Sequence, residues 1–176
     1  MILTDDLKPG DLLLTRTTSY FGKWIRRGAA MSDLPNLVNH VIIVRQRDKV
    51  GKQWGIEGRP GGAGWVVITD DLMRNPYTMN NCKQAKTSDQ RKIVCEGAVK
   101  FLGTEYDWQA IVGDALDALH KPNPWDDLWE EGYPSHVVCS SAADYLYEQA
   151  NLEAPIMDRN CKPGDWAKLW IERGWA

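Results

Sequence analysis

The sequence predicts an α+β fold, with an antiparallel sheet in the first half of the chain and helices in the second. Short runs rich in β-branched residues, separated by turns that contain glycine or proline, extend to about residue 69. After residue 88 the apolar residues recur at intervals of three and four, the period of an amphipathic helix. We expect residues 1–176 to form a single domain, because this length supports a core of its own.

Short strands are expected first, most of them in one antiparallel meander. The second is the clearest, because NHVIIVRQ is dense in β-branched side chains. A Pro-Gly pair precedes the first strand, RDKVGK follows the second, and the glycine-rich loop RPGGAG follows the third. The expected strands are 11–16, 39–46, 53–58, 65–69 and a further one near 81–85.

Helices are expected to dominate the C-terminal half. Ser88 is expected to cap the longest one with half a capping box, because Arg91 stands where Glu or Gln would complete it. A proline near the start and Gly174 after the end bound the last one. The expected helices are 20–31, a long one from Ser88, 108–119, one from Cys139, and one within 162–174.

Charge and hydropathy exclude several classes of protein. The net charge of −3 gives no electrostatic case for nucleic acid as a partner. No segment approaches the ~20 apolar residues of a transmembrane anchor, and the acidic start MILTDDLKPG does not resemble a signal peptide. We therefore expect a protein made in the cytoplasm, which would need release or export by another route to act elsewhere.

One local cluster of positive charge departs from this balance. Lys23, Arg26 and Arg27 lie within YFGKWIRRGAAM. The simplest interpretation is the solvated face of a short helix, and contact with a phosphate or an anionic lipid is the alternative.

The cysteines do not form a metal site. Cys82, Cys95, Cys139 and Cys161 are too far apart for a C-x-x-C pair, and adding His136 supplies two ligands at most. We expect no metal and no organic cofactor. A domain of this size does not need disulfides either.

Cys139 stands where the β-prone segment 136–138 changes into a helical pattern. A helix N-terminus carries partial positive charge and free N–H groups, so a thiol there ionises more readily than one in apolar surroundings. Position makes Cys139 a candidate nucleophile, and an inert buried thiol is the alternative.

A nucleophilic thiol needs a base, and the chain has three histidines. His120 lies in a Lys-Pro-Asn-Pro loop, where we expect a solvated side chain. His136 would point to the opposite face from Cys139 if the segment between them is extended. His40 opens the clearest strand, where it is either a core residue or a base directed into a cleft.

Strand geometry connects His40 to Glu57. If a four-residue turn, 47–50, joins the second and third strands, residues whose numbers sum to 97 lie opposite each other, and His40 faces Glu57. Directly opposed Cβ atoms are ~4.5–5.5 Å apart, so a carboxylate there could orient the imidazole. A slip of one residue would separate the pair, and Glu57 would then be a surface carboxylate. Asn39 and Asp107 are the next candidates to orient His40.

Several short motifs across nearly the whole chain resemble one family. They are LKPGDLLLTR, NHVIIV, WGIEGRPGGAGWVV, GTEYDW, VVCSSAADYLYE and CKPGDWAK. Together they resemble the permuted branch of the NlpC-type papain-like amidohydrolases, which includes the YiiX-like proteins and is related to the lecithin retinol acyltransferase group. In that branch the histidine precedes the nucleophile, as His40 precedes Cys139 here.

The resemblance implies a circularly permuted papain-like fold, in which an antiparallel meander or barrel packs against helices and the nucleophile lies at a helix N-terminus. It makes Cys139 the nucleophile, His40 the base and Glu57 the group that orients the base. It also implies that Tyr106 lines the active site, and we expect Trp108 in the same motif to contact substrate.

The expected function is that of a thiol-dependent hydrolase of amide bonds. By resemblance alone, the substrate is a peptide or peptidoglycan fragment with D-residues or γ-linkages, cleaved by an endopeptidase or amidase. One alternative is a lipid-directed acyl hydrolase or acyltransferase, which apolar cleft walls and a tryptophan rim would favour. The other is a non-catalytic binding module with a degenerate cleft, which could use exposed tryptophans among the nine in the chain. The better interpretation of Trp125 and Trp129, and of Trp166 and Trp170, is packing at helical spacing.

Overall fold

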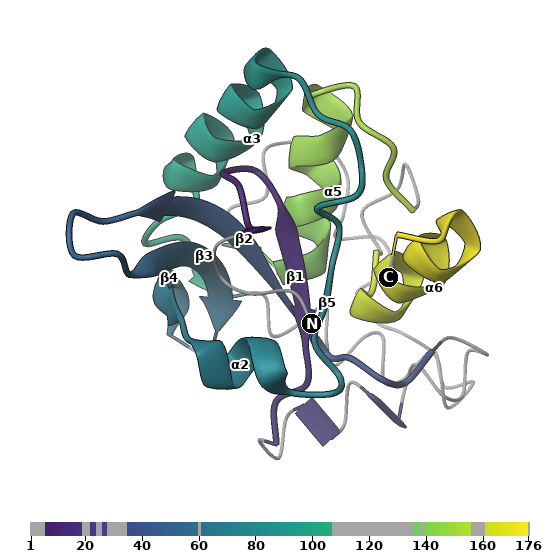
Figure 1. Ribbon diagram of the computed structural model, residues 1–176. Coiled ribbons are helices and arrows are strands. Elements are labelled where there is room, and N and C mark those ends of the chain that lie inside the picture. The colour runs from purple at the N-terminus through teal and green to yellow at the C-terminus, as the bar shows by residue number, and fades with distance from the viewer. Residues whose placement is uncertain are drawn as a thin grey trace.

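A computed structural model describes residues 6–18, 22–23, 26–27, 35–59, 61–106, 136–137, 139–155 and 161–175. These residues form an open, five-stranded antiparallel sheet with helices packed on it (Figure 1). The chain is therefore α+β, as the sequence predicts.

The sheet is a meander with one added strand. Its strands are β1 (Leu12–Thr15), β2 (His40–Arg47), β3 (Gln53–Arg59), β4 (Gly62–Ile68) and β5 (Met79–Asn80). The order β4-β3-β2-β1-β5 confirms the predicted meander for the first four strands, and β5 pairs with the other edge of β1. A separate parallel pair joins β6 (Glu105–Tyr106) to β7 (His136–Val137).

The predicted boundary of the fourth strand is wrong, because part of the expected glycine-rich loop belongs to β4. The Ala63 N–H donates to the Thr104 carbonyl at 2.9 Å, and the Gly103 N–H donates to the Ala63 carbonyl at 3.0 Å. A Cβ atom on Gly62 would lie 2.8 Å from the Thr104 oxygen, and Gly62 has a φ of +106°. Glycine is therefore required for this close approach.

The strand predicted near 81–85 lies instead at Met79–Asn80. Asn81 ends it, because its side-chain oxygen accepts a hydrogen bond from the Leu12 N–H at 2.8 Å. Its carbonyl then accepts from the Gln84 N–H and closes a turn.

The described helices are α2 (Asp70–Arg74), α3 (Ser88–Lys100), α5 (Cys139–Gln149) and α6 (Pro163–Arg173). The cap predicted for α3 is wrong by one residue, because Thr87 is the N-cap and Gln90 completes a full capping box with it. The end of α6 is confirmed, since Gly174 adopts a left-handed conformation with a φ of 67°. The helix predicted at 108–119 lies outside the described residues. Of the one predicted at 20–31, residues 22–23 and 26–27 are described, and they are helical.

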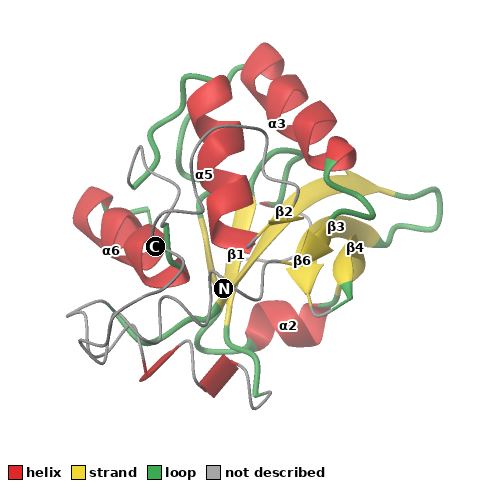
Figure 2. Cartoon of the chain, turned by 180° about the vertical axis from the view of Figure 1, so that it is seen from behind, coloured by secondary structure: helices red, strands yellow, loops and turns green. Residues whose placement is uncertain are grey.

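Alternation along β2 divides the core into two layers. Val41 and Ile43 face α3 and α5, in a cluster that also buries Trp166 and Trp170 of α6. Even-numbered residues of β2 face the other side, where Leu72 and Met73 of α2 pack. In Figure 2, which views the molecule from behind, α5 lies in front of the sheet. The packing role predicted for Trp166 and Trp170 is confirmed, because both side chains are fully buried.

A buried ionic cluster lies where β1 begins. One carboxylate oxygen of Asp11 is 2.9 Å from the Lys86 ammonium and 2.9 Å from the Arg91 guanidinium. The side chains of Asp11 and Lys86 are both 0% exposed. Two buried opposite charges that are paired stabilise each other, but either one alone would be strongly unfavourable.

Tyr147 extends this cluster to α5. Its hydroxyl donates to the Gly10 carbonyl at 2.8 Å and accepts from the side-chain amide of Asn81 at 2.8 Å. Because α5 begins at Cys139, these bonds help to fix the position of that thiol relative to β1.

The Asp11→Ala substitution is expected to lower the free energy of unfolding by about 3–5 kcal/mol, because it leaves the Lys86 ammonium buried without its counter-charge. Urea denaturation followed by circular dichroism would measure the change. Asp71→Ala is the matched control, since that carboxylate is 96% exposed, and its effect is expected to stay within about 0.5 kcal/mol. Superimposable curves for Asp11→Ala and the wild type would contradict the prediction.

Candidate active site

Cys139 is the first residue of α5 and lies at the end of the sheet where β2 begins. Cys139 is 4% exposed. Backbone hydrogen bonds from Val41 and Ser140 reach the sulfur, and so does a hydrogen bond from the His40 ring. The thiol therefore lies among donors supplied by a strand and by a helix N-terminus.

These donors decide the ionisation of Cys139. Burial raises the pKa of the thiol, but the charge of His40, the ring hydrogen bond and the backbone donors outweigh burial and lower the pKa from its ordinary value. At Cys82 and Cys95 burial is the largest influence and raises the pKa. The predicted helix-start position of Cys139 is confirmed, and its pKa is shifted in the direction that a nucleophile needs.

His40 joins Cys139 to Glu57. Its Nε2 atom is 2.7 Å from Glu57 Oε2, and the two side chains are 12% and 13% exposed. This leaves Nδ1 as the ring nitrogen for the thiol. Burial lowers the pKa of His40, but the Cys139 thiolate and then Glu57 outweigh it and raise the pKa to about 10. The geometry favours a thiolate–imidazolium pair at neutral pH.

The predicted register between β2 and β3 is wrong by two residues. Glu57 pairs with Ile42, not with His40. The residue opposite His40 in the sheet is Thr15, across the β1 edge. Because the error is an even number, Glu57 and His40 still share one face of the sheet, and long side chains reach each other across such a diagonal.

Asp48 explains the register, because its side chain organises a longer turn. Arg47 pairs with Gln53, so the turn is 48–52 and not the four residues predicted. One carboxylate oxygen of Asp48 accepts from the backbone of Val50 and of Lys52, and the other accepts from the Trp54 indole at 2.9 Å. The turn alone displaces the register by three residues, since Arg47 and Gln53 sum to 100 and not to 97, and an irregularity between Val44 and Gln46 takes one residue back, which leaves a displacement of two at Glu57.

Asn39, an alternative orienter of His40, has a different role. Its side chain is buried, accepts from the Thr17 N–H at 2.8 Å and donates to the Thr17 carbonyl at 3.0 Å. These bonds fix the backbone directly before His40 and leave the ring to Glu57. The other alternative, Asp107, lies outside the described residues.

Arg59 is a member of the site that sequence reasoning missed. Its guanidinium is 3.6 Å from the second oxygen of Glu57 and is 54% exposed. Gly64 provides room for it, since a Cβ atom there would lie 3.2 Å from the guanidinium. The sequence carries one signal for this contact. Arg59 is two residues after Glu57, and residues two apart on a strand share one face.

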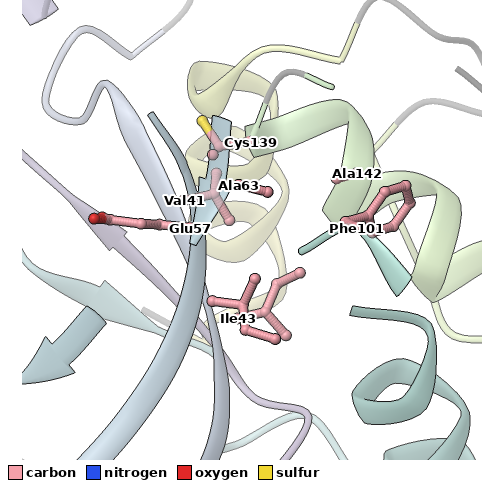
Figure 3. Close-up of a pocket in the computed structure, with 9 residues that line it drawn as sticks. Val41, Ile43, Glu57, Ala63, Phe101, Cys139 and Ala142 are labelled. Carbon is pink, nitrogen blue, oxygen red and sulfur yellow. The ribbon is translucent and has the colours of Figure 1, made fainter. Parts of the chain in front are cut away.

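A small apolar cavity of about 10 Å³ lies beside Cys139, with room for roughly one water molecule. It is lined by Val41, Ile43, Ile56, Glu57, Gly58, Ala63, Phe101, Cys139 and Ala142. In Figure 3 the Cys139 sulfur and the Glu57 carboxylate both point away from Ile43 and Phe101. The cavity is therefore a packing feature behind the thiol, and a substrate must approach the sulfur from another side.

The remaining predicted site residues are only partly placed. Tyr106 lies in β6 and pairs with Val137, two residues before Cys139, so its backbone is close to the thiol. Trp108 lies outside the described residues, as does His120. His136 lies in β7 and pairs with Glu105.

Two features are absent from the described part of the chain. No group of three or more His, Cys, Asp or Glu side chains there is placed to hold a metal ion. No helix there is long and apolar enough to cross a membrane.

The Glu57→Gln substitution is expected to slow alkylation of Cys139 by iodoacetamide at pH 6, by at most about tenfold for each pKa unit by which the thiol is shifted. The amide can still bond the ring but no longer supports the charge on His40. Rates would be measured by peptide mapping. Glu96→Gln, at a carboxylate that is 61% exposed on α3, should leave the rate unchanged. An unaltered rate in Glu57→Gln would mean that another group supports His40.

The geometry combines three chemical capacities. The thiolate can attack a carbonyl carbon, the imidazolium can supply a proton, and backbone N–H groups at the start of α5 can stabilise developing negative charge. No protein-family model and no curated protein matches the chain. The case for function therefore rests on the residues themselves.

Proposed function

We propose that this protein is a cysteine amidohydrolase, with Cys139 as the nucleophile, His40 as the proton carrier and Glu57 as the group that orients the imidazole. The observation that carries the proposal is the chain of contacts from the thiol to His40 and from His40 Nε2 to Glu57 at 2.7 Å. Burying three ionisable groups together is unfavourable for packing alone, and such clusters are typical of active sites.

In the proposed reaction the Cys139 thiolate attacks the carbonyl carbon of an amide. The oxygen of that carbonyl gains negative charge, which the N–H groups at the start of α5 stabilise. The tetrahedral intermediate expels the amine, which takes its proton from His40, and an acyl thioester remains on Cys139. Neutral His40 then removes a proton from water as the water attacks the thioester. The products are a carboxylic acid and the restored thiolate–imidazolium pair.

The order of these residues supports assignment to the permuted branch of the NlpC-type papain-like amidohydrolases. His40 and Glu57 come from neighbouring strands of the meander, and Cys139 comes from the start of a later helix. We propose a circularly permuted papain-like fold on this basis, and a cell-wall-type peptide as substrate by the same resemblance.

The lipid-directed alternative receives no support from the described residues. Trp166 and Trp170, two of the tryptophans considered for an apolar rim, are fully buried. These two tryptophans therefore cannot form an apolar rim for a lipid.

Trapping of the acyl thioester tests the proposal. Wild-type protein would be mixed with purified muropeptides, and separately with a short-chain acyl lipid, then quenched in acid and measured by intact mass. An adduct on Cys139 that hydroxylamine releases is expected with the muropeptides. Cys139→Ala is the control and should show none.

Two outcomes would contradict the proposal. An adduct with the acyl lipid but not with muropeptides would favour the lipid-directed reaction. No adduct with either substrate or with a vinyl sulfone would favour a binding module.

A further inference from the structure

Arg16 and Arg26 form a cationic cluster. The charge of Arg16 acts on Arg26, whose pKa is lowered first by burial and then by this repulsion. Among the residues that the structure describes, no carboxylate forms an ion pair with either guanidinium. Arg26 binds the carbonyl of Thr17, the residue that directly follows Arg16, so both arginines lie beside the same stretch of backbone. Like charges placed in this way without a counter-charge are a favourable place for an anion.

Each guanidinium is held by a specific contact. Arg26 Nη1 donates to the Thr17 carbonyl at 3.0 Å. The guanidinium carbon of Arg16 lies 4.1 Å from the centre of the Tyr77 ring. One such contact leaves other N–H donors on each guanidinium, since arginine carries five.

Both arginines lie at the end of the sheet that carries the candidate active site. Arg16 directly follows Thr15, which pairs with His40 across β1 and β2. The Thr17 carbonyl that accepts from Arg26 also accepts from the Asn39 side chain, and Asn39 directly precedes His40. The cluster is therefore linked to the His40 backbone by hydrogen bonds.

A solvated helix face explains only part of this basic segment. Lys23 and Arg27 are exposed and fit that interpretation. Arg26 does not, because it is half-buried, bonded to Thr17 and repelled by Arg16, which comes from a different element.

We propose that Arg16 and Arg26 form a binding site for a carboxylate group of the substrate, adjacent to the amide that Cys139 attacks. This rests on the proposed function and adds the charge class of its substrate, an acidic peptide. A carboxylate matches the planar donors of guanidinium and would relieve the repulsion between the two arginines. On a chain of net charge −3, such a local cluster would also attract acidic ligands selectively.

Two small electrophiles of matched size test this site without a known substrate. Iodoacetate carries a carboxylate next to the reacting carbon, and iodoacetamide is its neutral counterpart. The measurement is the ratio of their alkylation rates at Cys139, followed by peptide mapping. Arg16→Gln and Arg26→Gln are each expected to lower the ratio about threefold or more, with the iodoacetamide rate unchanged.

Matched variants separate the cluster from general charge effects. Arg27→Gln removes the same charge from an exposed neighbour and should leave the ratio unchanged. Arg16→Lys and Arg26→Lys keep the positive charge and should retain most of the preference for iodoacetate. If a glutamine variant fails to fold, the salt dependence of the ratio in the wild type gives a second measurement. A preference for iodoacetate that high salt does not reduce would overturn the site.

Competition identifies the class of anion. Succinate is expected to protect Cys139 from iodoacetamide in the wild type but not in Arg16→Gln or Arg26→Gln. Protection by inorganic phosphate without protection by succinate would overturn the carboxylate assignment. If the ratio of iodoacetate to iodoacetamide rates is unchanged in both glutamine variants, the anion site is overturned. The proposed function still stands in that case, provided that Cys139 reacts. A Cys139 that reacts with neither electrophile would overturn both.

Discussion

The Cys139→Ser protein is expected to cleave muropeptides at least about 10³-fold more slowly than the wild type. In the wild type the nucleophile is already ionised, because His40 and backbone donors lower the pKa of the thiol. A serine hydroxyl remains protonated at neutral pH beside the same imidazole. Initial rates of product formation, measured by liquid chromatography and mass spectrometry, would give the ratio.

Cys82→Ser is the control for this comparison, because it removes a half-buried thiol whose pKa burial raises. Its rate is expected to stay within about twofold of the wild type. Equal losses in Cys82→Ser and Cys139→Ser would point to a general effect on folding. Full activity in Cys139→Ser would show that cleavage does not use this thiol.

The His40→Ala protein is expected to lose at least about 10²-fold in the rate of Cys139 alkylation at pH 6. Without the imidazolium, the charge and the ring hydrogen bond that lower the pKa of the thiol are lost, and only the Val41 and Ser140 backbone donors still oppose burial, so far less of the thiol is ionised at this pH. Iodoacetamide treatment followed by peptide mapping would measure the rate at Cys139. His136→Ala is the matched control, since that residue is the rejected candidate base.

The shape of the pH profile adds a second readout. In His40→Ala the rate should rise about tenfold per pH unit until the thiol ionises, whereas in the wild type it should be nearly flat around neutrality. Turnover by the wild type should fall as the pH rises through about 10, because His40 then loses the proton that the leaving amine needs. A pH-6 loss in His136→Ala but not in His40→Ala would assign the base to His136.

The contact between His40 and Glu57 could be predicted because it depends on which face of the sheet each residue occupies. Alternation along a strand is dictated by backbone geometry, and two cores, one on each face, reinforce it. The register could not be predicted, because it depends on how the Asp48 side chain closes the turn. The predicted register was wrong by two residues, and because two is an even number the side chains of His40 and Glu57 still share one face.

Other features escaped prediction because they depend on tertiary contacts. The Thr87 cap is a local exception, because Thr87 and Gln90 match the capping-box pattern in the sequence itself. Lys86 has no sequence feature that marks it as buried, since its counter-charge Asp11 lies directly before the first strand. Arg26 reaches the backbone beside Arg16 through its bond to the Thr17 carbonyl, a contact that forms only once the chain is folded.

The connection between Tyr147 and the start of β1 has a consequence for biosynthesis. A ribosome makes β1, His40 and Glu57 long before it makes α5, and Tyr147 can bond the Gly10 carbonyl only after α5 has left the exit tunnel. Until α5 docks, Cys139 lacks the imidazolium and the Val41 donor that lower its pKa. A nascent or misfolded chain therefore carries an ordinary thiol at Cys139. The thiol becomes reactive only when folding brings α5 against the N-terminal strands.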